Sequence, residues 1–273
     1  MRPSILSSCF VTVVFCTILL AGCTSSAPLN PDTGPQTASP ANLLISEAAV
    51  QPNFSGEFIE VYNPADLPVS LDDVYIADYP AYYGVVNGVS AGGYDFNMRF
   101  PEGAVIEAGG VIVIAVYTAG DFFDTYGFYP DFDTEASDEN APAMEGSFGM
   151  MPNLNDVAEM VVLYSWGGSG DLVTDIDYIG YGEPMELDQM DKTGVTIDGP
   201  DADSDTSGYL ADTAITSQDL MVAPGDGQSM KRTDFTEGAE TKTGGNGMTG
   251  HDETSEDYNN TFTVSDSPSP GEL

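Results

Sequence analysis

The chain has 273 residues, with 44 Asp and Glu against 6 Lys and Arg, so its formal net charge at pH 7 is −38. Hydrophobic residues make up 41% of the sequence and aromatic residues 10%, a composition typical of folded proteins rather than acidic disordered segments. The shortage of basic residues excludes nucleic acid as a partner, because few cations could replace the counterions of a phosphate backbone.

The first residues have the pattern of an export signal. Arg2 precedes an apolar stretch, residues 5–20, that is shorter than the roughly 20 apolar residues of a membrane-spanning helix. The stretch ends in Leu20, Ala21, Gly22 and Cys23, a tetrapeptide that resembles the lipobox of bacterial lipoproteins. In that family the chain is cut before the cysteine, whose thiol carries the lipid. An ordinary secretory signal with an incidental Cys23 is the alternative.

This resemblance implies a lipid-anchored protein of the bacterial cell envelope. Thr24 follows the cysteine, and by the same resemblance this residue favours export to the outer membrane of a Gram-negative bacterium. Cys9 and Cys16 lie in the segment that would be removed, so the mature chain would keep one cysteine and no internal disulfide. We therefore expect a signal peptide at 1–22, a lipidated Cys23 with a flexible Ser/Thr/Pro tether at 23–41, and a folded domain at 42–272.

The folded part has the pattern of an all-β protein. Short runs of Val, Ile, Tyr and Phe alternate with clusters of Gly, Pro, Asn and Asp, and no apolar period near 3.6 lasts longer than two turns. Ile59 and Val61 should share one face of a strand, with Phe58, Glu60 and Tyr62 on the other. The sequence predicts an antiparallel β-sandwich with strands at 43–48, 57–62, 73–77, 105–106, 111–117, 158–164, 172–178, 228–232 and 261–264.

A series of motifs resembles the lamin tail domain. The segments match that family's motifs in order, and they lie at 44–47 (LISE), 57–66 (EFIEVYNPAD), 68–78 (PVSLDDVYIAD), 106–114 (IEAGGVIVI), 175–182 (DIDYIGYG), 228–232 (QSMKR) and 269–271 (SPG). Tyr75 stands where that family usually has tryptophan. The resemblance implies an immunoglobulin-like β-sandwich.

Long insertions separate the predicted strands near 79–97, 120–155 and 183–227, and any feature peculiar to this protein should lie there. The first insertion contains Tyr79, Tyr82 and Tyr83, which could form a stacking platform for a glycan or a docking patch for a protein. The alternative is that these rings cover an end of the sandwich.

Four carboxylates in the third insertion are the best candidate for a metal site. Asp201, Asp203, Asp205 and Asp212 have spacing that could hold Ca²⁺, although the loop lacks the glycine, final glutamate and flanking helices of an EF-hand. The alternative is a solvated acidic loop.

Candidate catalytic residues are sparse. His251 is the only histidine, so a Ser-His-Asp triad and a histidine-based zinc site are poorly supported. Glu60, inside an apolar strand, is interpreted as a structural carboxylate rather than a ligand or a catalytic group. We assign no catalytic residue.

The sequence favours a membrane-anchored, non-catalytic binding or scaffolding lipoprotein with an unidentified protein or glycan ligand. A Ca²⁺-dependent envelope hydrolase or hydrolase accessory protein, built on the insertions, is one alternative. A purely structural envelope protein is another.

Overall fold

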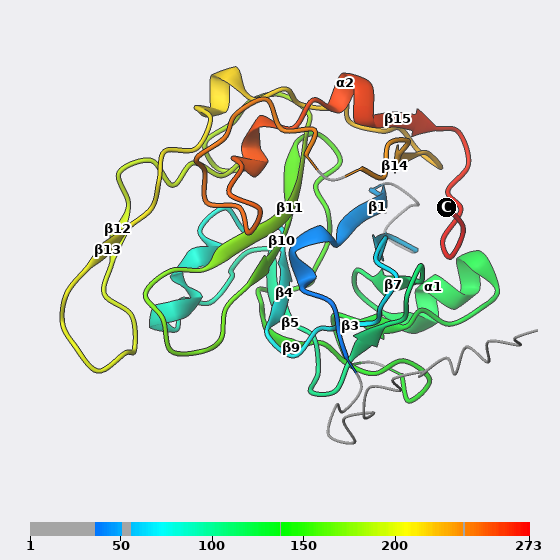
Figure 1. The fold of residues 1–273 in the computed structure, drawn as a ribbon. Coiled ribbons are helices and arrows are strands. Elements are labelled where there is room, and N and C mark those ends of the chain that lie inside the picture. Colours follow the sequence, from blue (N-terminus) through cyan, green and yellow to red (C-terminus); the bar gives the residue numbers. More distant parts are fainter. Residues whose placement is uncertain (1–35, 51–55, 137, 237) are drawn as a thin grey trace, which may run out of the picture. The chain divides into compact units, whose positions relative to one another are not determined.

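The computed structural model describes residues 36–50, 56–136, 138–236 and 238–273, which belong to one compact unit, Gln36–Leu273 (Figure 1). The lipobox residues Leu20, Ala21, Gly22 and Cys23 lie outside the described residues. Within the described ranges, no helix is both long and apolar enough to cross a membrane.

The first of two main sheets has six strands. Its order is β15-β14-β1-β2-β7-β8, and neighbouring strands are antiparallel except β7 and β8, which are parallel. The parallel pair at this edge is an exception in an otherwise antiparallel sheet. The strands are β1 (Leu44–Ala49), β2 (Phe58–Tyr62), β7 (Val111–Ala115), β8 (Phe132–Asp133), β14 (Ser229–Arg232) and β15 (Phe262–Ser265).

The second main sheet has five strands in the order β11-β10-β4-β5-β9, all antiparallel. Two short ladders, β3 with β6 and β12 with β13, lie outside the main sheets. The strands are β3 (Val69–Ser70), β4 (Val74–Ala77), β5 (Phe96–Arg99), β6 (Val105–Ile106), β9 (Glu145–Phe148), β10 (Glu159–Ser165), β11 (Thr174–Tyr181), β12 (Thr196–Ile197) and β13 (Ser207–Gly208).

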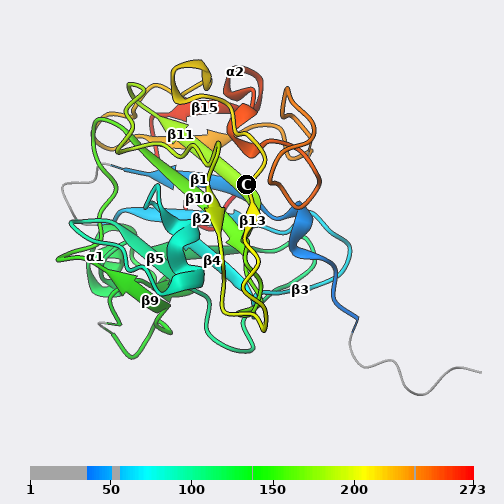
Figure 2. The same cartoon turned by 90° about the vertical axis from the view of Figure 1, so that its left-hand side faces the viewer.

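The hydrophobic core joins residues of both sheets. Ile59 and Val61 of β2 lie in the same buried cluster as Ile76 of β4, whereas Phe58 belongs to a second cluster on the opposite face of β2. The predicted division of β2 into two faces is therefore confirmed, and so is the all-β sandwich class. Figure 2 shows the strands of the two sheets from the side.

A helix that the sequence analysis did not identify covers the outer face of the six-stranded sheet. It is α1 (Ala119–Tyr126), which begins after Thr118, whose hydroxyl accepts from the Asp121 N–H, and ends at Gly127 in the left-handed region. Phe122 packs edge-on against Phe58, with 6.0 Å between ring centroids. The remaining helical segments are α2 (Tyr258–Thr261) and the 3₁₀ turns η1 (Pro40–Asn42), η2 (Tyr82–Asn87), η3 (Ile215–Ser217) and η4 (Glu253–Ser255).

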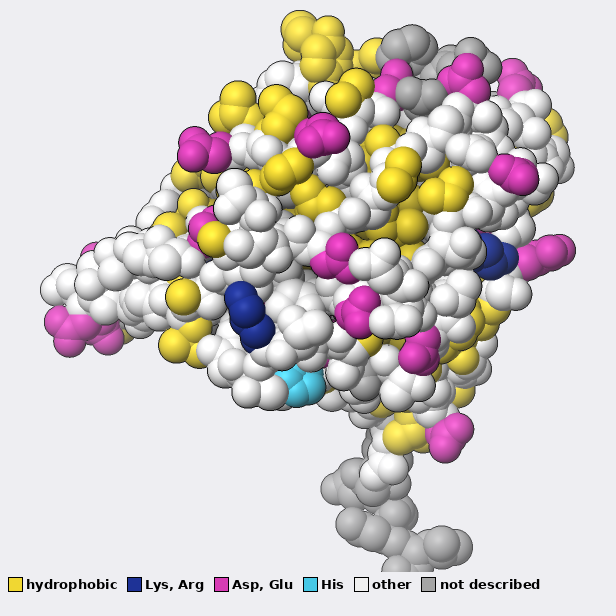
Figure 3. Space-filling view, turned by 90° about the horizontal axis from the view of Figure 1, so that it is seen from above, with side chains coloured by type: hydrophobic (Ala, Val, Ile, Leu, Met, Phe, Trp, Pro, Cys, Tyr) yellow, Lys and Arg dark blue, Asp and Glu magenta, His cyan; other side chains and the backbone are white. Residues whose placement is uncertain are grey.

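The insertions contain regular elements, namely β8, β9, β12, β13, α1 and part of β5. The compact unit includes residues 36–41 of the segment predicted as a tether, and there the Ala38 N–H donates to the Pro68 carbonyl. On the face drawn in Figure 3, acidic side chains are spread widely and basic side chains are sparse.

Candidate functional site

An irregularity in β11 sends two aspartates of one strand to different places. Leu163 of β10 pairs with Asp177, but the next residue, Tyr164, pairs with Asp175, so Ile176 is an extra residue in the ladder. Paired residues point to the same side of a sheet and successive residues to opposite sides. Asp175 and Asp177 therefore face opposite sides of the sheet, although they are two residues apart.

Asp177 faces the six-stranded sheet, where it binds Arg232 of β14. The Arg232 guanidinium donates to both Asp177 oxygens, at 2.7 and 2.8 Å, and to Glu256 at 3.2 Å, and its Nε donates to the Ile45 carbonyl at 3.0 Å. Arg232 is 2% exposed and Asp177 is 2% exposed. This ion pair joins β14, β1 and β11, and thus the two sheets, in the interior.

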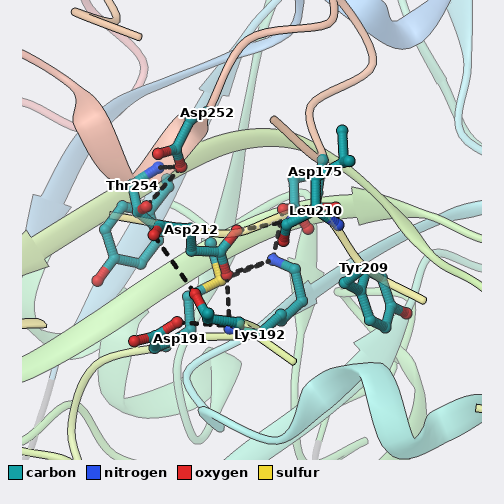
Figure 4. A network of polar contacts seen from close by, with 12 residues as sticks. Asp175, Asp191, Lys192, Tyr209, Leu210, Asp212, Asp252 and Thr254 are labelled. Carbon is teal, nitrogen blue, oxygen red and sulfur yellow. Dashed lines mark hydrogen bonds and ion pairs between the residues drawn. The ribbon is translucent and has the colours of Figure 1, made fainter. Parts of the chain in front are cut away.

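Asp175 faces the insertions, where it binds Lys192 (Figure 4). The Lys192 ammonium donates to Asp175 Oδ2 at 2.7 Å and to the Tyr82 hydroxyl at 2.8 Å, and it lies 3.3 Å from Asp212 Oδ2. The Tyr82 hydroxyl in turn donates to Asp175 Oδ1. Lys192 and Tyr82 have no exposed surface. We call Lys192, Asp175, Asp212 and Tyr82 the lysine cluster.

Asp212 is held on both of its oxygens. Oδ2 accepts from the Lys192 backbone N–H at 2.7 Å, and Oδ1 accepts from the Asn246 amide at 2.6 Å. Beyond it, the hydroxyl of Thr213 donates to Asp252 at 2.7 Å and accepts from the Lys242 ammonium at 2.8 Å. The lysine cluster is therefore one end of a longer polar network.

Burial and charge act against each other in the lysine cluster. Burial raises the pKa of Asp212, and Lys192 opposes this shift. Burial alone would lower the pKa of Lys192, but the carboxylates of Asp175 and Asp212 outweigh it and leave that pKa above its ordinary value. Burial also raises the pKa of Tyr82, which stays a neutral hydroxyl donor. The cluster thus holds an ion pair and a phenol away from water.

The three candidate aromatic residues have different environments. Tyr82 belongs to the core, so a role as a stacking surface for a ligand is wrong for this residue. Tyr83 is half-buried, and it lines an open cavity of about 340 Å³ beside the lysine cluster. Tyr79 is half-buried just before that cavity in sequence, and its carbonyl accepts from the Tyr82 N–H. The other residues of the cavity wall are Pro80, Ala81, Glu186, Gln189, Asp191, Thr193 and Ile215.

The predicted set of metal ligands is not brought together. Asp203 and Asp205 are exposed in the loop between β12 and β13, whereas Asp212 binds Lys192. Asp201 instead forms a group with Asp171 and Asp198, whose carboxylate oxygens lie within 4.8 Å of one another. Among the described residues, these three acidic side chains are close enough together to share a cation.

Glu60 lies on the outer face of the six-stranded sheet with no exposed surface. Its oxygens accept from the Ser46 hydroxyl and the Gly271 N–H, both at 2.6 Å. These bonds support the interpretation of Glu60 as a structural carboxylate. His251, the only histidine, lies 3.1 Å from a Glu240 oxygen.

Three further buried carboxylates lie at strand ends, namely Glu57 directly before β2, Asp78 directly after β4 and Glu159 at the start of β10. Burial raises the pKa of Glu57 to about 8 and that of Glu159 to about 9. Burial and the nearby Glu159 raise the pKa of Asp78, whose Oδ2 has no hydrogen-bond partner among the described residues. An uncharged Asp78 carboxyl fits this environment, because an unpaired buried charge would cost several kcal/mol.

Lys192 and Arg232 were not identified from the sequence. The sequence signal that could have indicated them is the scarcity of basic residues, because each is one of only 6 in a chain with 44 acidic residues. In such a chain, a lysine within an acidic insertion, as Lys192 is, has many possible carboxylate partners.

Comparison with known proteins gives a distant similarity of fold. No family model matches the chain, and no curated protein matches it. Among solved structures, the chain is similar to a DUF4876 family protein from Bacteroides thetaiotaomicron. The TM-score is 0.45, 14% of the residues are identical, and the match covers 82% of this chain and 70% of that chain.

Proposed function

We propose that this protein is a membrane-anchored, non-catalytic binding or scaffolding lipoprotein of the bacterial cell envelope. The observation that carries the proposal is the Leu20-Ala21-Gly22-Cys23 tetrapeptide at the end of an apolar stretch. The folded unit begins shortly afterwards, at Gln36. Stable anchoring follows from more than one acyl chain, because each buried methylene contributes about 0.8 kcal/mol.

Lipidation is tested in the native host or a bacterial expression host with an alkyne-tagged fatty acid. We expect the full chain to take up the label and to sediment with membranes. Cys23→Ser should abolish both properties, whereas the matched change Cys9→Ser, within the predicted signal, should preserve them. A wild-type chain that is released without label would overturn the proposal.

The cavity beside Tyr83 is the ligand site that we propose. Tyr83 offers a ring face, and the carboxylates of Glu186 and Asp191 offer acceptors for hydroxyl groups. Aromatic faces combined with such polar groups suit a glycan, which presents apolar ring faces and many hydroxyls. The cavity of about 340 Å³ is within the range of sites for small ligands.

A glycan array and isolated envelopes test this site. Tyr83→Ala should lower binding about ten-fold, because stacking of this size contributes about 1 to 2 kcal/mol. Tyr94→Ala is the matched control, since Tyr94 is 51% exposed and does not line the cavity. Equal losses in the two variants would contradict the assignment.

The alternative function, a Ca²⁺-dependent hydrolase or hydrolase accessory protein, has one expected metal ligand fewer, because Asp212 is paired with Lys192. We therefore expect residues 198–206 to exchange hydrogen at the same rate in EGTA and in millimolar calcium. Calcium-dependent protection of this loop would favour a cation site around Asp171, Asp198 and Asp201 and restore that alternative.

A further inference from the structure

We propose that Lys192 and Asp175 become joined by an intramolecular amide, an isopeptide bond, which forms in the folded protein with Asp212 as the proton carrier. The ion pair described above places the reacting groups in contact, with Lys192 Nζ at 2.7 Å from Asp175 Oδ2. The proposal concerns the construction of the domain and does not depend on the proposed ligand or anchor.

The surroundings of Lys192 exclude water. Its side chain and that of Asp175 are 0% and 2% exposed, and the side chain of Asp212 is 1% exposed. The ammonium lies 5.3 Å from the centre of the Tyr82 ring and 5.7 Å from that of Tyr209. Met190 Sδ is 3.4 Å from Nζ. A dry, aromatic pocket keeps water away from a new amide and so disfavours its hydrolysis.

The contact between Lys192 and Asp175 in the interior allows the bond to form without an external catalyst. Holding two reacting groups together can raise their effective concentration to about 10⁵ M or more. Both groups are fixed here, because Asp175 lies in β11 and Lys192 is anchored through its own backbone N–H to Asp212, at 2.7 Å. The chain therefore supplies the proximity that condensation of a free amine and a carboxylic acid lacks in water.

The proton balance of the step closes within the lysine cluster. The step starts from the arrangement in the structure, with the Lys192 ammonium in contact with Asp175 and Asp212. Lys192 gives one proton to Asp212, and the neutral Nζ attacks Asp175 Cγ. Asp212 passes this proton to one Asp175 oxygen and then carries the second proton that Nζ loses to the same oxygen, which leaves as water, so Asp212 ends unchanged. The N–C bond forms, one C–O bond breaks, and one water leaves, with no oxidant or reductant involved.

Contacts of the two carboxylates distinguish the electrophile from the proton carrier. The Tyr82 hydroxyl donates to Asp175 Oδ1, where it can stabilise negative charge that develops as Nζ attacks Cγ. Both Asp212 oxygens are instead occupied by N–H donors, from Lys192 and Asn246, and Nζ is farther from it, at 3.3 Å. Asp212 is thus close enough to exchange protons, while Asp175 is the carboxyl that Tyr82 activates.

The bond would fasten the third insertion to the sandwich. Lys192 and Asp175 are 17 residues apart in sequence, and the bond closes a covalent loop that includes the end of β11. The cysteines all precede Thr24, so residues 36–273 contain no cysteine that could form a disulfide. An amide supplies a covalent cross-link that needs no cysteine.

Peptide mass spectrometry of the folded full chain tests the proposal. A protease that cuts after glutamate, but not before proline, separates peptide 160–186, which holds Asp175, from the peptide that begins at Leu187 and holds Lys192 and Asp212. We expect these two peptides to be joined, with a mass lower than their sum by one water molecule. Two separate peptides of full mass would overturn the proposal. Loss of water within the second peptide alone would place the bond at Asp212 and overturn the assignment to Asp175.

Variants define each role. Lys192→Arg keeps the positive charge but should give separate peptides, whereas the matched change Lys242→Arg, in the adjoining network, should leave them joined. Asp212→Asn removes the proton carrier and should reduce the joined product at least about ten-fold. An undiminished product in Asp212→Asn would overturn the role of Asp212.

Discussion

Glu47 and Glu60 lie directly opposite each other on β1 and β2, and neither side chain has exposed surface. The C-terminal segment covers them. The Ser269 N–H and hydroxyl donate to Glu47 at 3.0 and 2.9 Å, and the Gly271 N–H donates to Glu60 at 2.6 Å. Three segments that are far apart in sequence, near 47, 60 and 270, therefore meet at one place.

Removing residues 267–273 should destabilise the domain by about 2 to 4 kcal/mol, because each buried carboxylate loses charge-assisted hydrogen bonds. The measurement is the free energy of unfolding in urea. Glu60→Gln should recover part of the loss in the truncated chain, since a neutral amide is less costly to leave unpaired. Deletion of Leu273 alone, a residue that is 51% exposed, is the control and should have little effect.

Stability should fall as the pH rises from 6 to 9. The folded-state pKa values of Glu57 and Glu159, about 8 and about 9, lie above the ordinary value of 4.5. Their contribution to the free energy of unfolding is complete below pH 4.5 and is lost as the pH rises through the folded-state pKa values. The reason is that, between these pH values, the folded chain holds protons that the unfolded chain has released, so a rise in pH favours unfolding. Urea unfolding at several pH values should show a shallower slope for Glu159→Gln. Glu145→Gln, at a largely exposed site, is the control and should keep the wild-type slope. A wild-type protein that is as stable at pH 9 as at pH 6 would contradict the prediction.

The buried ion pair of Arg232 and Asp177 should contribute far more than the surface pair of Arg99 and Glu145. Asp177→Asn leaves the Arg232 charge inadequately compensated in the interior and should cost about 3 to 5 kcal/mol. Glu145→Gln breaks a pair whose side chains are 34% and 54% exposed, so the loss should be below about 1 kcal/mol. Thermal and urea unfolding of the two variants provide the comparison, and similar losses would show that Asp177 is not the link between the sheets that its contacts indicate.

Tyr82 and Tyr83 are neighbours that should respond differently to substitution. Tyr82→Ala removes a core ring together with the hydroxyl contact to Asp175 and Lys192, and should cost about 3 to 5 kcal/mol. Tyr83→Ala removes a half-buried ring and should cost about 1 to 2 kcal/mol. Calorimetry distinguishes the two, and a Tyr82→Ala protein with near wild-type stability would exclude a core role for this residue.

All nine predicted strands exist. Most of them are apolar runs bounded by turn residues, whereas the segment 228–232 (QSMKR) is largely polar. The strands that were not predicted carry a weaker signal. β5 (Phe96–Arg99) contains Asn97 and Arg99, and β9 (Glu145–Phe148) is exposed over half its length, so neither forms an apolar run. α1 was not predicted because it spans only about two turns, too few for a helical period to stand out.

The lysine cluster could not have been predicted from the strand pattern. A strict two-residue alternation places Asp175 and Asp177 on the same face, and only the extra residue in β11 separates them. The partners of Asp175 come from segments far away in sequence, at Tyr82, Lys192 and Asp212. Such a meeting depends on the path of the insertions, which carry no periodic signal.

The burial of Lys192 and Arg232 affects the outside of the molecule as well as the interior. Their charges are matched at short range by Asp175, Asp212, Asp177 and Glu256, so most of the remaining carboxylates must draw their neutralising ions from the solvent. The domain should carry a diffuse atmosphere of sodium, potassium or other dissolved cations, and dilution of the electrolyte will extend it. Its electrophoretic mobility and its approach to other anionic macromolecules will then be governed by ionic strength.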